Sequence, residues 1–217
     1  MLAMVLHVRG ILFDIDGTLV DSTAAVERSW RTWAREYRVD ADEVVRACHG
    51  RRTEDVVLQF VSPQRRAAAA ARELALELAD LDDVVALPGS RQVLDALPRE
   101  RWAAVTSGER SLMTARLQAS GLPVPQTLIG AEDVSIGKPG PDGYLKAAAA
   151  LGFQARDCLV VEDSPAGISA GRAAGARVLA VTTSHDLAEL GGADVVVADL
   201  SCVSVELTDH GVAVLTH

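Results

Sequence analysis

The sequence predicts an α/β protein: a Rossmann-like doubly wound parallel sheet with an inserted all-helical cap domain. From Trp102 to Val197, short apolar runs rich in β-branched residues alternate with helical stretches, as in folds of this class. Between about Ser22 and Val85 the alternation stops, and helical segments follow one another without a strand signal. We therefore expect an α/β core formed by residues 1–20 and 86–217, and a helical cap formed by residues 21–85.

The strands of the sheet are expected at six apolar runs. Short runs bounded by Gly, Pro, Asp or Ser are typical of parallel strands that are buried on both faces. The runs are Val8–Phe13, Trp102–Val105, Thr127–Ile129, Leu159–Val161, Val178–Val181 and Val195–Val197. The last segments of the chain, around Asp209-His210-Gly211, are expected to pair as a terminal hairpin.

The helices are marked by residues suited to their ends. Ser62-Pro63 and Ser164-Pro165 each combine an N-cap residue with proline at the first helical position. Gly121, Gly152 and Gly175 follow helical stretches and suit the left-handed position after a helix. Helices are therefore expected over Ala24–Tyr37, Asp40–Ala47, Thr53–Phe60 and Pro63–Leu81 in the cap, and over Ser111–Ser120, Pro141–Leu151 and Ser164–Ala174 in the core.

Composition excludes several classes of partner. The formal net charge of −9 argues against nucleic acid and anionic membranes. No apolar run reaches the length of about 20 residues that a membrane span needs. The three cysteines are isolated, which predicts neither a zinc site nor disulfides and favours a cytoplasmic location. We expect a monomer or a weak dimer.

Two pairs of acidic residues follow predicted strands. Asp14 and Asp16, in the segment Asp14-Ile15-Asp16-Gly17-Thr18, come directly after the first strand, and Glu162-Asp163 follows the strand Leu159–Val161. Side chains at i and i+2 of an extended segment point the same way. Open α/β sheets bind ligands at the carboxyl ends of their strands. Clustered carboxylates repel one another, so a hard divalent cation is the natural partner. The alternative for each pair is a polar turn or a helix cap.

Two further segments suit an anionic ligand. Thr106-Ser107-Gly108 follows the strand Trp102–Val105, and hydroxyl and backbone N–H groups before a helix can bind phosphate. Lys138 lies in the loop Gly137-Lys138-Pro139-Gly140-Pro141 and is one of only two lysines, Lys146 being the other. A site that needs one compact ammonium group would keep lysine in a chain that otherwise prefers arginine. An ordinary strand-to-helix turn and a surface lysine are the alternatives.

Taken together, Asp14-x-Asp16-Gly17-Thr18, Thr106, Lys138 and Glu162-Asp163 resemble the ordered motifs of the haloacid dehalogenase-like phosphohydrolases. The helical insertion after the first strand resembles the small cap of that family. The stretches Leu97–Gly108 and Glu162–Ile168 are similar to the branch that contains 2-deoxyglucose-6-phosphatases and glycerol-3-phosphatases. The resemblance implies a Mg²⁺-dependent phosphatase that acts on small phosphorylated sugars or polyols.

The resemblance also implies a role for each motif. Asp14 would form an aspartyl-phosphate, and Asp16 would protonate the leaving alkoxide and then activate water. Thr106, Ser107, Gly108 and Lys138 would hold the phosphoryl oxygens. The residues implied at the metal are Asp14, Asp16 through its backbone carbonyl, Glu162 and Asp163.

Substrate selection is expected in the cap. The polar segment His49-Gly50-Arg51-Arg52-Thr53 joins two predicted cap helices, and in related proteins the corresponding loop faces the core. We expect His49 or Arg52 to contact the sugar or polyol, with Arg51 and Thr53 beside them; exposed residues at a helix start are the alternative. A β-phosphoglucomutase-like hexose phosphomutase stays open as another activity. A non-enzymatic phospho-acceptor regulator is disfavoured, because receiver domains lack such an insertion.

Overall fold

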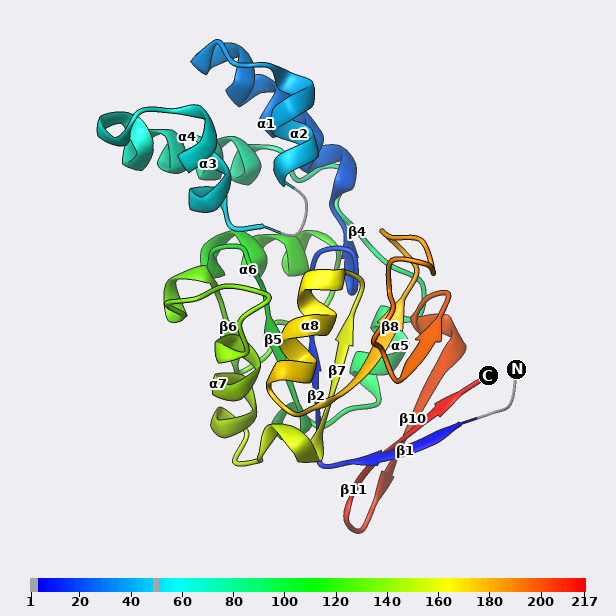
Figure 1. Cartoon of the computed structure of the whole chain (residues 1–217). Helices are drawn as coiled ribbons and strands as arrows, with labels where there is room; N and C mark the ends of the chain where they lie inside the picture. The colour runs from blue at the N-terminus through cyan, green and yellow to red at the C-terminus, as the bar shows by residue number, and fades with distance from the viewer. Residues whose placement is uncertain (1–3, 49–50) are drawn as a thin grey trace.

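A computed structural model describes residues 4–48 and 51–217 and has a six-stranded parallel sheet at its centre (Figure 1). The strand order is β6-β5-β2-β7-β8-β9. The bounds are β2 (Gly10–Phe13), β5 (Trp102–Val105), β6 (Leu128–Ile129), β7 (Cys158–Glu162), β8 (Arg177–Val181) and β9 (Val195–Val197). The predicted parallel sheet is therefore confirmed, and β2 lies in its middle, between β5 and β7.

Helices cover both faces of this sheet. Side chains alternate along a strand, so Ile11 and Phe13 of β2 pack on one face while Leu12 packs on the other. The first face is covered by α5 (Ser90–Asp95), which the sequence analysis missed, and α6 (Arg110–Ala119). The second is covered by α7 (Asp142–Ala150) and α8 (Pro165–Ala173). Two apolar cores therefore fix the sheet from both sides.

The first apolar run departs from its prediction, because it is two strands in different sheets. β1 (Val5–Val8) bends at Arg9 and pairs antiparallel with β11 (Gly211–Thr216), which also pairs with β10 (Val203–Thr208). All four residues of β2 are buried, whereas β1 alternates between exposed and buried residues. The sequence analysis took Val8–Phe13 as one strand, although Arg9 and Gly10 lie within it. The predicted terminal hairpin is confirmed and forms most of this second sheet, at the lower right of Figure 1.

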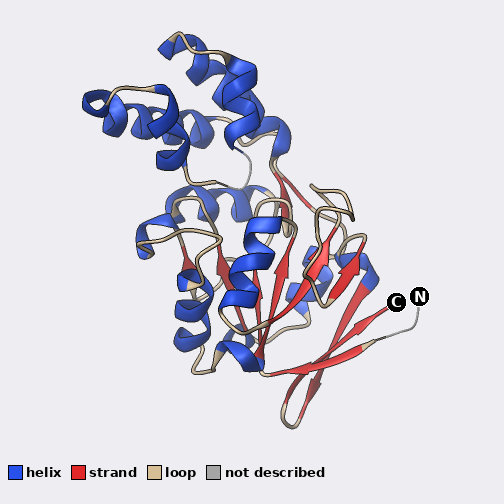
Figure 2. Ribbon diagram, viewed as in Figure 1, coloured by secondary structure: helices blue, strands red, loops and turns tan. Residues whose placement is uncertain are grey.

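Four helices form a separate group beyond the carboxyl ends of the sheet strands (Figure 2). They are α1 (Thr23–Tyr37), α2 (Ala41–Cys48), α3 (Thr53–Phe60) and α4 (Arg66–Ala79), and a 3₁₀ turn over Pro63–Arg65 precedes α4. The group has its own apolar core around Trp30 and Trp33, and the Trp33 indole donates a hydrogen bond to the Ala69 carbonyl at 2.9 Å. We call α1–α4 the helical group.

A two-stranded ribbon joins the helical group to the rest of the chain. β3 (Val20–Asp21) pairs antiparallel with β4 (Val85–Ala86), so the chain enters and leaves the group side by side. The sequence shows no signal for strands this short. No helix in the described ranges is both long and apolar enough to cross a membrane.

Glu73 is a buried acid inside the helical group. Neither of its carboxylate oxygens has a hydrogen-bond partner among residues 4–48 and 51–217, and the Ser29 hydroxyl donates instead to the Val26 carbonyl at 2.8 Å. Burial raises the pKa of Glu73 to about 8. The nearby Ser29 hydroxyl and Arg116 oppose the rise, and the charge of Glu77 adds to it. Burial of Glu73 therefore favours its protonated form in the folded protein.

We expect Glu73→Met to make the free energy of unfolding less dependent on pH. Between the ordinary pKa of 4.5 and about 8 the unfolded chain releases this proton while the folded chain keeps it, so wild-type stability falls as pH rises. The variant should be more stable by roughly 2–4 kcal/mol above pH 8 and nearly unchanged at pH 4. Urea unfolding at several pH values measures this difference, and a constant difference across the range would contradict the assignment.

Gly89 is expected to tolerate no side chain, because two constraints coincide there. Its φ is +79°, and a Cβ would lie 2.1 Å from the carbonyl carbon of Leu200 and 2.2 Å from the backbone nitrogen of Ser201. We expect Gly89→Ala to lower the free energy of unfolding by about 3 kcal/mol or more. Gly152→Ala is the control, because its φ is +77° but nothing lies within 4 Å of the added Cβ. Its cost should be about 1 kcal/mol, and equal losses in urea unfolding would contradict the steric part of the argument.

Candidate active site

The motifs singled out in the sequence meet at the carboxyl ends of the central strands. Asp14 follows β2 and extends the ladder, since its backbone N–H donates to the Val161 carbonyl at 3.0 Å. Thr106 follows β5 in the same way, and its N–H donates to Ile129. Glu162 is the last residue of β7. These ends open into a cavity of about 430 Å³ that α1 and α4 of the helical group also line.

Three buried carboxylates form a cluster at the base of this cavity. Asp14, Glu162 and Asp163 each offer an oxygen, and these oxygens all lie within 4.8 Å of one another. The ammonium group of Lys138 enters the cluster and donates to Asp14 Oδ1 and Glu162 Oε1. Lys138 therefore lies within the acid cluster, and its side chain is 8% exposed.

Glu162 is fully engaged by protein donors. Oε1 accepts hydrogen bonds from Lys138 and from the Tyr144 hydroxyl at 2.8 Å. Oε2 accepts from the Ser164 hydroxyl at 3.0 Å and from the backbone N–H groups of Asp163 and Ser164 at 3.1 Å. Its role in this geometry is to orient Lys138, and direct contact with a metal would require giving up some of these bonds.

The pKa values in the cluster follow from burial and from the position of the one ammonium group. Burial raises the pKa of Asp14 well above its ordinary value, although Lys138 opposes the rise. Burial also raises the pKa of Asp163 to about 7, and the Glu162 charge adds to it. At Glu162 the effect of burial is outweighed by Lys138 and the other donors, which hold its pKa below the usual range. Negative charge on Asp14 and Asp163 is therefore only partly compensated by Lys138.

The surroundings of Asp163 suit a hard cation. Its Oδ1 accepts from the Thr18 hydroxyl at 3.3 Å, and its Oδ2 accepts from Ser184. A Cβ at Gly17 would lie 2.2 Å from Oδ2, and the φ of Gly17 is +84°, so glycine keeps this approach open. Carboxylate oxygens are the ligands that Mg²⁺ prefers. The residues present therefore fit the predicted ion, with Asp14 and Asp163 the best placed to hold it.

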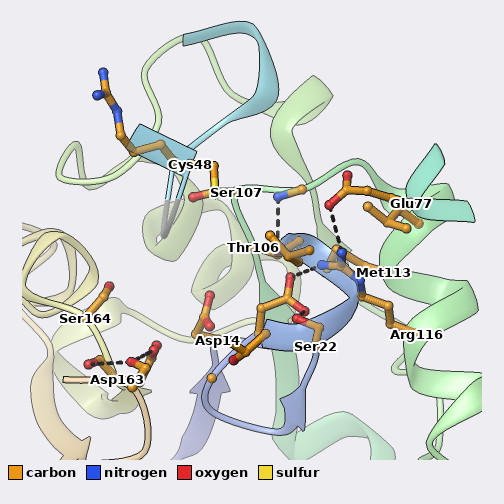
Figure 3. Close-up of a pocket in the computed structure, with 18 of the residues that line it drawn as sticks. Asp14, Ser22, Cys48, Glu77, Thr106, Ser107, Met113, Arg116, Asp163 and Ser164 are labelled. Carbon is orange, nitrogen blue, oxygen red and sulfur yellow. Dashed lines mark hydrogen bonds and ion pairs between the residues drawn. The ribbon is translucent and has the colours of Figure 1, made fainter. Parts of the chain in front are cut away.

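The side chain of Asp16 does not join the carboxylate cluster. Its Oδ1 accepts from the Ser22 hydroxyl at 2.8 Å and its Oδ2 from Arg116 at 2.6 Å (Figure 3). The i, i+2 rule applies to an extended chain, whereas here the N–H groups of Thr18 and Leu19 turn back to the Ile15 carbonyl. Asp14 and Asp16 therefore line the same cavity, but the carboxylate of Asp16 binds Ser22 and Arg116 instead of joining the cluster.

The predicted phosphate-binding segment lies on the opposite wall of the cavity. Thr106, Ser107 and Gly108 all line it, and the Thr106 hydroxyl oxygen accepts from the Gly108 N–H at 3.0 Å. This contact fixes the turn after β5 and keeps the Thr106 side chain at the strand end. Figure 3 shows Thr106 and Ser107 above Asp14, on the side away from Asp163.

The predicted substrate-contacting residues of the helical group divide between two places. Arg51 and Thr53 line the large cavity. Arg52 instead pairs with Asp55 at 3.0 Å and packs against the Lys138 loop, where a Cβ at Gly137 would lie 3.0 Å from its Nε. His49 lies outside the described residues.

The sequence analysis did not single out several residues that line or adjoin the cavity. They are Ser22, Glu77, Arg116, Thr183, Ser184 and His185, together with Tyr144 beneath the site. Ser184 and Thr183 follow β8, the next strand of the sheet, and Thr183 donates to the Gly17 carbonyl. The one available signal was the pair of polar residues directly after β8. The motifs at β2, β5 and β7 were identified by the same signal, polar residues at the end of a strand.

Comparison with known proteins gives a consistent result. The family model for haloacid dehalogenase-like hydrolases matches residues 8–175. The chain is 39% identical to hexitol phosphatase A of Escherichia coli, covering 94% of this chain and 96% of that protein. It is 36% identical to 2-deoxyglucose-6-phosphate phosphatase 1 of Saccharomyces cerevisiae, covering 89% of each. It is 34% identical to glycerol-1-phosphate phosphohydrolase 2 of the same yeast, covering 92% of this chain and 86% of that one.

Solved structures share the fold. A hydrolase from Pseudomonas syringae superposes with a TM-score of 0.80 at 25% identity, covering 89% of this chain and 94% of that one. A β-phosphoglucomutase from Clostridium difficile superposes with a TM-score of 0.78 at 20% identity, covering 89% and 92%. The second likeness shows the common architecture alone. Both support the sheet and helical group described above.

We expect Gly167→Ala to destabilise the protein, although alanine is the better helix former. A Cβ at Gly167, in α8, would lie 1.7 Å from Glu162 Oε1 and would displace the carboxylate that holds Lys138. The loss in urea unfolding should be about 3 kcal/mol, as for other broken buried ion pairs. Gly171→Ala, on the same helix, meets only apolar side-chain carbons of Val160 and Val178, at 3.0–3.1 Å, and should cost clearly less. Equal costs would contradict the role of Gly167 in seating Glu162.

Proposed function

Since the chain belongs to the haloacid dehalogenase-like hydrolase family and is a phosphoric monoester hydrolase, we propose that it is a Mg²⁺-dependent phosphatase for small sugar or polyol phosphates. The observation that carries this proposal is the buried cluster of Asp14, Glu162 and Asp163 around Lys138, beside a cavity that holds hydroxyl groups on its opposite wall. The likeness to phosphatases of sugar and polyol phosphates, over nearly the whole chain, supports the substrate class.

In the proposed reaction Asp14 is the nucleophile. A carboxylate oxygen of Asp14 forms a bond to phosphorus, the bond from phosphorus to the ester oxygen breaks, and the leaving alkoxide takes a proton from Asp16. Water then attacks the aspartyl-phosphate, Asp16 accepts its proton, and inorganic phosphate leaves. The Asp14 side chain is 9% exposed and held by Lys138, so its position is set before substrate arrives.

Charge compensation is the main task of the other residues, because phosphoryl transfer depends on positioning and neutralisation. Lys138 lies beside Asp14 and would contact the phosphoryl oxygens together with Thr106 and the backbone of Ser107 and Gly108. Asp14 and Asp163, with the backbone carbonyl of Asp16, would hold Mg²⁺. The ion would supply further positive charge against the dianionic ester.

The helical group is proposed to be the cap that selects the leaving group. It closes the cavity above the sheet, and its Arg51 and Thr53 line that cavity together with Glu27 and Trp30. Arg51 and Thr53 are therefore proposed to contact the sugar or polyol, rather than Arg52. A cytoplasmic location and a monomeric or weakly dimeric state stay predictions.

The test is phosphate release from a panel of phosphomonoesters with Mg²⁺, including 2-deoxyglucose 6-phosphate, hexitol phosphates and glycerol phosphates. Asp14→Asn should lower kcat by at least about 10³-fold, because it removes the nucleophile while keeping the side-chain shape. Asp209→Asn makes the same chemical change in the exposed turn of the terminal hairpin and should leave kcat unchanged. Chelation of divalent ions should abolish release, and added Mg²⁺ should restore it.

Three outcomes would contradict the proposal. Phosphate release that survives Asp14→Asn would exclude the aspartyl-phosphate route, and release that survives chelation would exclude the metal. Conversion of β-glucose 1-phosphate to glucose 6-phosphate without net phosphate release would show a mutase instead. Acid quenching during turnover should also trap one phosphoryl group on the wild-type protein and none on the Asp14→Asn variant.

A further inference from the structure

Arg116 is a buried cation that joins the core to the helical group. It lies on α6, and its side chain is 4% exposed. One nitrogen, Nη1, contacts Asp16 Oδ2 at 2.6 Å, and the other, Nη2, contacts Glu77 Oε1 at 2.9 Å. Asp16 belongs to the loop after β2, whereas Glu77 lies on α4. Figure 3 shows Arg116 with Glu77 above it and Ser22 beside it.

The two carboxylates fix the direction of this guanidinium group. Its Nε has no hydrogen-bond partner among the residues that the structure describes. Burial would lower the pKa of Arg116, but Asp16 and Glu77 outweigh that effect and hold the pKa above its ordinary value. Arginine presents its donors in a planar, rigid fork, so the direction of one arm determines the direction of the other. Glu77 therefore influences where the arm that meets Asp16 points.

The position of Asp16 depends on this contact. Ser22 holds Oδ1 and Arg116 holds Oδ2, so both oxygens of the carboxylate are bound by protein donors. Ser22 directly precedes α1, and Glu77 lies near the end of α4. Oδ2 of Asp16 is therefore linked to the helical group through Arg116 and Glu77, whereas Ser22 lies between β3 and α1, where the chain enters the group.

We propose that Arg116 is the positioning residue for Asp16 and that Glu77 sets its orientation from the helical group. The inference rests on the proposed function, because it takes Asp16 as the proton donor to the leaving alkoxide. The arrangement makes the proton-transfer geometry depend on where α4 lies relative to the sheet. Arg116 itself is not a catalytic residue in this account, since it acts through Asp16.

The experiment compares two substrates that differ in their need for a proton. A hexitol phosphate releases an alkoxide that must be protonated, whereas p-nitrophenyl phosphate releases a phenolate that leaves without one. kcat/KM reports the first step, the transfer to Asp14, for both. Glu77→Gln keeps the side-chain shape and should lower kcat/KM about 10-fold or more for the hexitol phosphate, and less than about 3-fold for p-nitrophenyl phosphate.

A second variant and a control make the comparison decisive. Arg116→Lys keeps the charge but replaces the fork by a single ammonium group, and it should show the same selective loss. Glu36→Gln breaks an Arg–Glu pair of the same kind, with Arg72 on α4 at 2.6 Å, on the outer surface of the helical group. It should leave kcat/KM unchanged for both substrates. Unfolding midpoints would be measured for all three variants.

The outcomes separate the two proposals. An equal fall in kcat/KM for both substrates, or no fall for either, would overturn the positioning role, because a general structural defect does not depend on the leaving group. If the wild-type protein releases phosphate from neither substrate, the proposed function itself fails and this inference falls with it. A selective loss in Glu77→Gln and Arg116→Lys, with Glu36→Gln normal, supports the positioning role.

Discussion

The buried ammonium group of Lys138 is the interaction on which the site depends. Parallel pairing of Phe13 with Val161 brings the next residues, Asp14 and Glu162, level at the ends of adjacent strands. Two carboxylates so close, with Asp163 beside them, would repel strongly without a cation between them. Lys138 meets both strand ends at once. Because both oxygens of Glu162 are bound by protein donors, Asp14 and Asp163 are the less fully bonded carboxylates of the cluster.

Much of this site could be predicted because parallel strands bring distant segments to one edge. Asp14, Thr106 and Glu162 each follow or end an apolar run. The parallel register of β2 with β5 and β7 then places these three residues at the same edge of the sheet. The seating of Glu162 was harder to predict. Glu162 accepts a hydrogen bond from Tyr144 on α7 and occupies space that Gly167 on α8 leaves open. No motif in the sequence marks either residue as a neighbour of Glu162. The break at Arg9 was missed for a related reason, since pairing with β11 is a contact across almost the whole chain.

The orientation of Asp16 shows where local rules stop. The i, i+2 rule assumes that the strand continues, but the chain turns at Ile15, and Gly17 adopts a φ of +84°. Glycine followed by threonine hinted at a turn without giving its direction. Arg116 could not be singled out either, because arginine is the common basic residue of this chain. Its importance comes from burial between two carboxylates of different elements, and burial of a single arginine is a property of the assembled fold.

The helical group meets the core through two arginine contacts, and the free energy needed to separate each contact differs. Arg52 packs on Gly137, but its ion-pair partner Asp55 lies on the same side of the interface. If the helical group moved away from the core at this point, the packing of Arg52 on Gly137 would be lost, but no salt bridge would be broken. Glu77 and Arg116 lie on opposite sides, and both are almost fully buried. Separating them would leave the buried Glu77 carboxylate without its partner, while Arg116 would keep Asp16, and this costs several kcal/mol unless water enters. The two contacts differ because the carboxylate partner of Arg52 is in the helical group itself, whereas Arg116 in the core pairs with Glu77 in the helical group. The contact at Arg116 is therefore the more costly one to separate.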